Sequence, residues 1–276
     1  MSNIEACFFD LDGTAVDGQG RLFDGLEEAL DPAGREFAVS ILTARGFTRY
    51  QEAVRENPSL TVTPGMPVAL ENGGRIIDST ASRNLHYQPL STGEQTAVCD
   101  YIRDAQPLRY VAFHGEELRT KTRLWSPDPV EAARLHAAYS DNADVFTGSK
   151  DELFRVIRES EPCMLTCRTS EGAPEGLPDG VKRYGRGTTV NFVPHSVDKG
   201  VAASMMADMA GIALPSLLAA GNDYNDMPVL GLEGLGCPVA VGPDMTPDML
   251  ADLPPFTVHL PLPQQLGGFV LERTQR

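Results

Sequence analysis

The sequence predicts an α/β protein in which an α+β domain is inserted into a parallel-sheet core. Apolar, strand-like runs alternate with helix-like segments near both ends of the chain, which is typical of parallel strands joined by helical crossovers. The middle of the chain mixes strands and helices with hairpin signals, which is typical of a compact α+β domain. We therefore expect a discontinuous core formed by residues 1–87 and 189–276, with the inserted domain at residues 88–188.

The first core segment contains expected strands at 4–9, 37–42, 68–70 and 75–77 and expected helices at 25–30 and 47–57. The last two of these strands flank Glu71-Asn72-Gly73-Gly74, which is a turn signal. We therefore expect the second of them to return beside the first as a hairpin.

The inserted segment contains expected helices at 94–103, 129–139 and 150–158, expected strands at 108–113 and 163–167, and two strand-like pieces that flank Gly185 and Gly187. Residues 171–180 are rich in Gly and Pro and predict an exposed loop. The second core segment contains expected strands at 189–193, 216–220, 238–241 and 256–259, a helix at 199–209 and the start of another at 227–230.

Charge and composition restrict the classes of partner. The net charge of −15 argues against nucleic acid or an anionic membrane as the main partner, because both attract basic surfaces. No apolar run approaches the roughly 20 residues of a membrane span, and the N-terminal residues do not resemble a signal peptide. Five cysteines at irregular spacing favour reduced thiols, so we expect a cytoplasmic protein.

Four polar clusters each follow an expected strand or begin an expected helix. They are Asp10/Asp12/Thr14, Thr43/Arg45, Lys199 and Asn222/Asp223/Asn225/Asp226. Because the carboxyl ends of parallel strands face the same way, these clusters can converge on one edge of the sheet. Two carboxylates as close in sequence as Asp10 and Asp12 repel each other unless a cation or a proton separates them. The first cluster therefore predicts a metal site, a proton-transfer role, or both.

The combined clusters suit the transfer of a phosphoryl group. Their ligands are oxygen atoms without a Cys/His set, which favours magnesium over zinc. A metal and Lys199 would neutralise phosphate oxygens while a carboxylate attacks phosphorus in line. An EF-hand calcium loop starting at Asp10 is excluded, because Ala15 and Arg21 stand where it needs Gly and Glu.

The same clusters resemble the motifs of a known superfamily. Asp10-Leu11-Asp12-Gly13-Thr14 resembles DxDGT, the first motif of the haloacid dehalogenase superfamily of phosphatases. Thr43 matches the hydroxyl of the second motif, Lys199 the lysine of the third, and Gly221–Asp226 resembles the fourth, GDxxND. The Asn72-Gly73 turn and the position of the insert make the chain similar to the Cof-like and sucrose-phosphatase-like branch. This resemblance implies a Rossmann-like core with a cap domain between the second and third motifs.

The resemblance also implies a role for each matched residue. Asp10 would be the nucleophile that becomes an aspartyl phosphate, and Asp12 would protonate the leaving alcohol and then activate water. Lys199 would hold the phosphate and stabilise the intermediate, while Thr43 would hydrogen-bond a phosphate oxygen. Arg45 and Asn225 are further candidates for contacts with the phosphate or the substrate. The implied ligands of Mg²⁺ are Asp10, Asp12 through its backbone carbonyl, Asn222, Asp223 and Asp226.

The fourth motif departs from the family pattern. Asn222 stands where the first acid of the motif is usual, and Asp223 follows it directly. Either Asn222 ligates the metal through its amide oxygen with one negative charge fewer, or Asp223 reaches in instead. In the second motif, Ala44 stands where a glycine often follows the hydroxyl residue.

We therefore expect a magnesium-dependent phosphatase that hydrolyses a phosphomonoester of a small metabolite, such as a sugar phosphate, with the cap domain selecting the substrate and covering the site. A phosphomutase on the same scaffold is an alternative, because it uses the same aspartyl phosphate. A catalytically inactive metabolite-binding protein is a second alternative, for which the Asn222 change would be the cause.

Overall fold

The computed structural model describes residues 3–104, 108–118, 120–139, 141–171, 180–185 and 187–274. The chain divides into two compact units. The core unit comprises Met1–Arg45, Arg49–His86 and Asp198–Arg276, and the inserted unit comprises Gly46–Thr48 and Tyr87–Val197. Apart from its two end residues, the loop expected at 171–180 lies outside the described residues.

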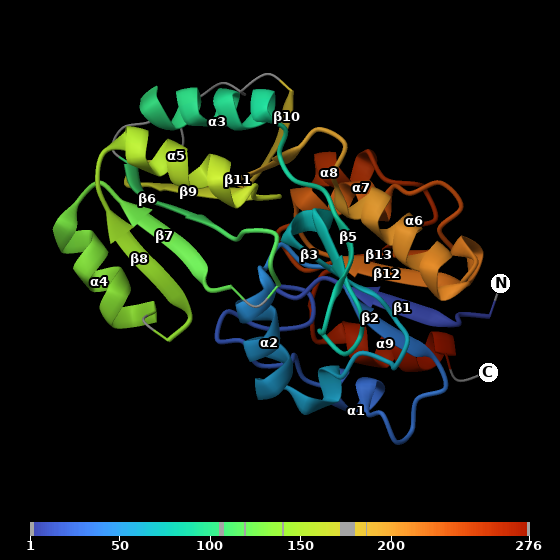
Figure 1. Ribbon diagram of the computed structural model, residues 1–276. Helices are drawn as coiled ribbons and strands as arrows, with labels where there is room; N and C mark the ends of the chain where they lie inside the picture. Colours follow the sequence, from blue (N-terminus) through green and yellow to red (C-terminus); the bar gives the residue numbers. More distant parts are fainter. Residues whose placement is uncertain are drawn as a thin grey trace. The chain divides into compact units, whose positions relative to one another are not determined.

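The core unit is built around a five-stranded parallel sheet (Figure 1). In spatial order its strands are β14 (Val258–Leu260), β13 (Cys237–Val241), β12 (Leu217–Gly221), β1 (Ala6–Phe9) and β2 (Ala38–Ile41). All four neighbouring pairs run parallel. Every residue of β1, β12 and β13 is buried, because helices cover both faces of the sheet. The predicted α/β class with a parallel-sheet core is confirmed.

Helices alternate with these strands along the chain. They are α1 (Leu26–Leu30), α2 (Phe47–Glu56), α6 (Lys199–Ala210), α7 (Met227–Leu230), α8 (Pro247–Ala251) and α9 (Gln265–Thr274). Four short 3-10 turns join them, η1 (Pro58–Leu60), η2 (Glu71–Gly73), η3 (Leu214–Ser216) and η4 (Tyr224–Asp226). Helices α6 and α7 lie on one side of the parallel sheet, and α1 and α9 lie on the other (Figure 1). Two of these helices, α8 and α9, were not expected from the sequence.

A small second sheet follows β2. Its strands are β3 (Val68–Leu70), β4 (Arg75–Ile77) and β5 (Asn84–Tyr87), in that order. Strands β3 and β4 pair antiparallel around the turn η2, so the predicted hairpin is confirmed. A parallel bridge between Leu42 and Ala69 connects β3 to the end of β2. This bridge brings the hairpin turn to the carboxyl edge of the parallel sheet.

The inserted unit is built around a six-stranded, mostly antiparallel sheet. In spatial order its strands are β10 (Val181–Tyr184), β11 (Thr189–Pro194), β9 (Leu165–Thr169), β6 (Leu108–Phe113), β7 (Thr122–Ser126) and β8 (Ala143–Thr147). Its helices are α3 (Thr92–Asp104), α4 (Pro129–Tyr139) and α5 (Lys150–Ser160). Residues from α3, α5 and the sheet share one apolar core that encloses Trp125 and Phe192. Leu124, the neighbour of Trp125, instead packs with Leu135 of α4, because successive strand residues point to opposite faces.

One expected strand lies in a different sheet from the one predicted. The strand at 189–193 was expected to begin the second core segment, but β11 pairs antiparallel with β10 and β9 in the six-stranded sheet. Val190 and Phe192 alternate with less buried neighbours and pack into the core of the inserted unit, which explains this placement. Strands β5, β7 and β8 were not expected at all.

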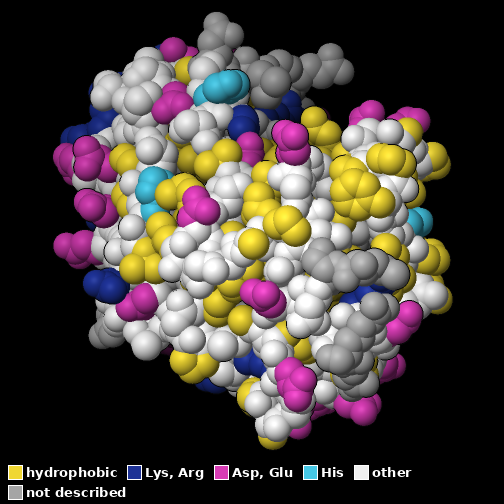
Figure 2. All heavy atoms as spheres, turned by 90° about the vertical axis from the view of Figure 1, so that its right-hand side faces the viewer, with side chains coloured by type: hydrophobic (Ala, Val, Ile, Leu, Met, Phe, Trp, Pro, Cys, Tyr) yellow, Lys and Arg dark blue, Asp and Glu magenta, His cyan; other side chains and the backbone are white. Residues whose placement is uncertain are grey.

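Acidic residues are dispersed on the face of the protein that Figure 2 displays. Their side chains lie among hydrophobic and uncharged ones and do not gather into a single patch (Figure 2). Among the described residues, no helix combines the length and apolar character needed to cross a membrane.

Candidate active site

The first motif begins where β1 ends. Asp10 follows the last residue of β1, and its backbone N–H donates to the Ala220 carbonyl of β12 over 3.0 Å. The chain then turns sharply, and Gly13 adopts a φ of 82°. A Cβ atom on Gly13 would lie 2.3 Å from Nδ2 of Asn222, so this position needs glycine for its backbone angle and for space. The first and fourth motifs are therefore in direct contact.

Lys199 occupies the centre of the site. It is the first residue of α6, its side chain is fully buried, and Nζ lies 2.6 Å from Oδ1 of Asp10 and 2.6 Å from Oδ1 of Asp226. Two carboxylates therefore flank one buried ammonium group, so the cluster carries one excess negative charge when both acids are ionised. Although burial opposes its charge, the two carboxylates raise the pKa of Lys199, so it stays protonated.

The two carboxylates have different surroundings. Burial raises the pKa of Asp10 to about 7, against the charge of Lys199, and the nearby Asp226 adds to this rise. Oδ2 of Asp226 accepts hydrogen bonds from the backbone N–H groups of Asn222 and Asp223, at 2.9 and 3.1 Å. Asp226 is thus fixed by Lys199 on one oxygen and by the backbone on the other. Of the two acids, Asp10 is the one placed directly after a strand of the parallel sheet, β1.

The structure distinguishes the two candidate residues of the fourth motif. The amide oxygen Oδ1 of Asn222 accepts from Oγ1 of Thr14 over 3.1 Å, so Asn222 faces the first motif. Oδ1 of Asp223 accepts from the backbone N–H of Tyr224 over 2.7 Å, within a capping box that Asp226 completes. Asp223 therefore caps the turn η4, and Asn222 is the residue beside Gly13 and Thr14.

The second motif lies at the end of the neighbouring strand. Thr43 is fully buried, its N–H donates to the Ala69 carbonyl, and its Oγ1 accepts from the N–H of Arg45. The guanidinium of Arg45 donates two hydrogen bonds to Asp12, from Nε to Oδ2 over 2.9 Å and from Nη2 to Oδ1 over 2.6 Å. Burial alone would raise the pKa of Asp12, but hydrogen bonding and charge from Arg45 lower it. The structure thus places Arg45, expected as a substrate contact, on the expected acid/base residue.

The donor groups of this site fit a hard divalent cation such as magnesium. Asp10, Asp226 and Asn222 supply carboxylate and amide oxygens, and such a cation accepts these together with water and backbone carbonyls. In the described parts of the chain, no group of three or more His, Cys, Asp or Glu side chains is arranged to hold a metal. A cation here would therefore depend on the Asn222 amide and on non-carboxylate oxygens in addition to the two acids. The side chain of Asp12 is turned to Arg45, which leaves its backbone carbonyl as its donor.

The sequence missed one residue of this site, Asn72. Nδ2 of Asn225 donates to Oδ1 of Asn72 over 2.9 Å, across 153 positions of sequence. The available signal was the Asn72-Gly73 turn, which indicated a change of chain direction and a resemblance to the Cof-like branch but no contact for the Asn72 side chain. A side-chain contact over this separation cannot be found from local pattern.

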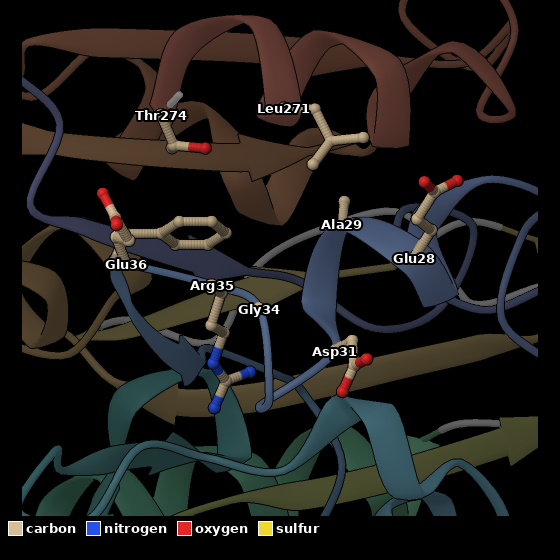
Figure 3. A pocket seen from close by; sticks show the side chains of 9 residues that line it. Glu28, Ala29, Asp31, Gly34, Arg35, Glu36, Leu271 and Thr274 are labelled. Atoms are coloured by element: carbon tan, nitrogen blue, oxygen red, sulfur yellow. The ribbon is translucent and has the colours of Figure 1, made fainter. Parts of the chain in front are cut away.

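A separate cavity lies at the opposite edge of the parallel sheet. It has a volume of about 520 Å³ and is lined mainly by the segment from Glu28 to Phe37, which precedes β2, and by Leu271 and Thr274 of α9 (Figure 3). Its half-buried cation, Arg35, already donates to the carbonyls of Leu30 and Thr61. This cavity contains none of the motif residues and is not the candidate site.

Comparison with known families identifies the class of protein. The family model of the haloacid dehalogenase-like hydrolases matches residues 7–246. This chain belongs to that family, and the predicted superfamily and hydrolase class are confirmed. No curated protein matches the sequence.

Solved structures of the same fold cover nearly the whole chain. A HAD/Cof-like hydrolase from Plasmodium vivax is 16% identical with a TM-score of 0.75, and the match covers 99% of this chain and 96% of that one. A subclass IIB sugar phosphatase of the superfamily is 15% identical with a TM-score of 0.72, over 98% of both chains. A phosphatase of the superfamily from Bacteroides thetaiotaomicron is 14% identical with a TM-score of 0.69, over 99% and 96%. At these identities the likeness shows a shared fold, and it agrees with the predicted Cof-like branch.

Proposed function

We propose that this protein is a magnesium-dependent phosphatase that hydrolyses a phosphomonoester of a small metabolite through an aspartyl phosphate on Asp10. The observation that carries the proposal is the buried Lys199, whose Nζ lies 2.6 Å from both Asp10 and Asp226 at the carboxyl edge of the sheet. Such an arrangement gathers a nucleophile and a fixed cation where a phosphate group can bind.

The proposed reaction has two halves. In the first, a carboxylate oxygen of Asp10 bonds to phosphorus, the P–O bond of the ester breaks, and the leaving oxygen takes a proton from Asp12. In the second, water attacks phosphorus, Asp12 takes a proton from that water, and the Asp10–phosphate bond breaks. Lys199 and the Thr43 hydroxyl hold the phosphate oxygens, and the Asn225 amide makes a further contact with the phosphate or the substrate. A bound magnesium ion, held by Asp10, Asp226, Asn222 and the backbone of Asp12, would supply positive charge to the phosphate oxygens.

The ion pair between Asp12 and Arg45 must open during the proposed reaction. An ionised Asp12, as the pair favours, suits the base that activates water in the second half. Protonation of the leaving group in the first half needs Asp12 to carry a proton, so its bonds to Arg45 have to open beforehand. Released from Asp12, Arg45 becomes able to contact the substrate phosphate, as the sequence led us to expect.

The class of substrate and the domain that selects it are also parts of the proposal. One structurally similar protein is a sugar phosphatase, which supports a sugar phosphate or a related small metabolite as the substrate. We further propose that the cap expected at residues 88–188, which the inserted unit extends to Val197, selects among these substrates. A cytoplasmic location fits such metabolites.

The Asp10→Asn variant tests the proposed nucleophile. With p-nitrophenyl phosphate and Mg²⁺, we expect its kcat to fall by about 10,000-fold, because an amide cannot form the acyl phosphate. The matched control Asp24→Asn changes an exposed carboxylate of the same core unit and should keep wild-type activity. Chelation of the metal should stop phosphate release by the wild type, and added Mg²⁺ should restore it.

Wild-type turnover by Asp10→Asn would refute the nucleophile. Transfer of phosphate within a sugar phosphate, without release of free phosphate, would instead indicate the phosphomutase. An absence of turnover of a broad set of phosphate esters by the wild type would favour the inactive binding protein.

A further inference from the structure

The turn between β3 and β4 has an unusual backbone. Glu71, Asn72 and Gly73 have φ angles of 55°, 58° and 98°, so two successive non-glycine residues adopt the left-handed region. Each such residue costs roughly 1–2 kcal/mol relative to a right-handed one, and residues of this kind cluster at functional sites. Glu71 and Asn72 are also buried, with exposed fractions of 1% and 0%. The surrounding structure must therefore hold this turn in place.

A buried ion pair stabilises the turn from within. Nε of Arg75 donates to Oε2 of Glu71 over 2.9 Å, and both side chains are 1% exposed. Nη1 of Arg75 also donates to Oδ1 of Asn84 in β5 over 3.1 Å. Breaking a buried pair of this kind is strongly destabilising, because it leaves an uncompensated charge in the interior. The pair therefore fixes the backbone of Glu71 and of the residue that follows it.

The backbone of the turn is attached to the second motif. The N–H of Glu71 donates to the Arg45 carbonyl and the N–H of Asn72 donates to the Thr43 carbonyl, both over 3.1 Å. Hence the strained turn fixes the loop that presents the Thr43 hydroxyl and the Arg45 guanidinium.

The turn also contacts the third and fourth motifs. A Cβ atom on Gly73 would lie 2.8 Å from the carbonyl oxygen of Asp198 and 2.7 Å from Cβ of Ala202, so the turn packs against the first turn of α6, where Lys199 begins the helix. Oδ1 of Asn72 accepts from Nδ2 of Asn225 over 2.9 Å. One short segment thus contacts the second, third and fourth motif regions. Its contact with the fourth motif is made by the side chain of Asn72.

We propose that Asn72 is a positioning residue of the active site, which acts by holding the amide of Asn225. This inference rests on the proposed phosphatase function. Asn72 itself makes its side-chain bond to Asn225 and its backbone bond to Thr43, so its amide can be removed while the backbone contact remains. Misplacement of a site residue by about 1 Å can cost about 100-fold in rate.

A double-mutant cycle on activity tests the proposal. The variants are Asn72→Gly, Asn225→Ala and the double variant, assayed with p-nitrophenyl phosphate and Mg²⁺. We expect each single variant to lower kcat by about 10- to 100-fold. If Asn72 acts through Asn225, the double variant will be no slower than Asn225→Ala alone, because the second change removes nothing further. Losses that multiply in the double variant, or wild-type kcat in Asn72→Gly, would overturn the proposal.

One further variant, Asn72→Ala, separates the role of the amide from that of the backbone. Glycine tolerates the positive φ at position 72 and alanine does not, so Asn72→Gly and Asn72→Ala delete the same amide with opposite effects on strain. Both should show the same loss of kcat and the same non-additivity with Asn225→Ala, whatever their melting temperatures. A loss of kcat in Asn72→Ala alone would show that only backbone strain matters, and would also overturn the proposal.

The control is Ala81→Gly. Ala81 has a φ of 54° in the turn between β4 and β5, and the change relieves a left-handed residue outside the motif segments. We expect wild-type kcat for this variant. Failure of the phosphatase proposal appears separately, as an inactive wild type or an active Asp10→Asn variant. The positioning proposal alone fails when the wild type is active, Asp10→Asn is inactive and the cycle is additive.

Discussion

At the scale of single residues, the site depends on charges that are removed from solvent and satisfied by one another. A fully buried lysine is tolerated only when it is paired, and Lys199 has two carboxylate partners at 2.6 Å. The asparagine at position 222 is compatible with this cluster, because Asp10, Asp226 and Lys199 already carry one excess negative charge when both acids are ionised. Within the fourth motif, Asp223 has the separate task of capping η4. The departure at Asn222 therefore leaves the lysine and both of its carboxylate partners in place.

The contact between Gly13 and Asn222 gives a prediction at this scale. Gly13→Ala would place a Cβ atom at a φ of 82° and 2.3 Å from Nδ2 of Asn222. We expect a loss in the free energy of unfolding of roughly 2–4 kcal/mol, from left-handed strain and overpacking together, and a kcat lowered by about 10-fold or more because Asn222 must move. Denaturant titration and steady-state kinetics measure the two effects.

Gly65→Ala is the matched control for that prediction. Gly65 has a similar φ of 87°, but no atom lies within 4 Å of the Cβ position. It should lose roughly 1–2 kcal/mol from strain alone and keep wild-type kcat. Equal effects of the two variants on stability and on kcat would contradict the account of the Gly13 contact.

At the scale of elements, the ends of strands and the starts of helices position the chemistry. The ends of β1, β2 and β12 carry the first, second and fourth motifs, and α6 begins at Lys199. The side chain of Asp198 accepts from the Val201 N–H at the start of α6, which fixes the first turn of the helix beside the site. Each catalytic candidate is thus attached to a buried element rather than to a free loop.

The ion pairs of Glu131 in the inserted unit should make the stability of the protein depend on pH. Glu131 of α4 binds Arg134 of the same helix and Arg109 of β6, at 2.9 and 2.7 Å. The hydrogen bonds of Arg134 and Arg109 lower the pKa of Glu131, against the opposing effect of burial. The unfolded carboxyl group therefore binds protons at a higher pH than the folded one, so its contribution to stability is present above the ordinary pKa and is lost as the pH falls through the lowered one.

We accordingly expect the melting temperature of Glu131→Gln to fall by less than that of the wild type when the pH is lowered from about 6 to about 3. The control is Glu159→Gln, which removes an exposed i,i+4 pair with Arg155 whose side chains are 57% and 60% exposed. Solvent screens that pair, so its removal should leave the pH dependence of the wild type nearly unchanged. A Glu131→Gln variant that follows the wild-type pH dependence would show that the ion pair does not stabilise α4 on the sheet.

At the scale of the whole molecule, the sequence predicted what continuous apolar runs and local motifs encode. The runs in β1 and β12 identified buried parallel strands, and each preceded a motif. The sheet to which each strand belongs was harder to predict from the sequence. The strand expected at 189–193 was assigned to the second core segment, although the alternation of Val190 and Phe192 fits the half-exposed antiparallel sheet where β11 lies. The bonds of Asp12 to Arg45 and of Asn225 to Asn72 depend on tertiary contacts over 33 and 153 positions, which no local pattern encodes.

Trapping the phosphorylated protein tests directly whether Asp10 is the nucleophile. The wild type would be mixed with a ³²P-labelled phosphate ester and Mg²⁺, quenched in acid within one turnover, digested with pepsin at low pH, where an acyl phosphate survives, and mapped. We expect the label on the peptide that contains Asp10, and no label in Asp10→Asn. Label on another peptide, or steady release of phosphate by the wild type without any labelled protein, would contradict an aspartyl phosphate at Asp10.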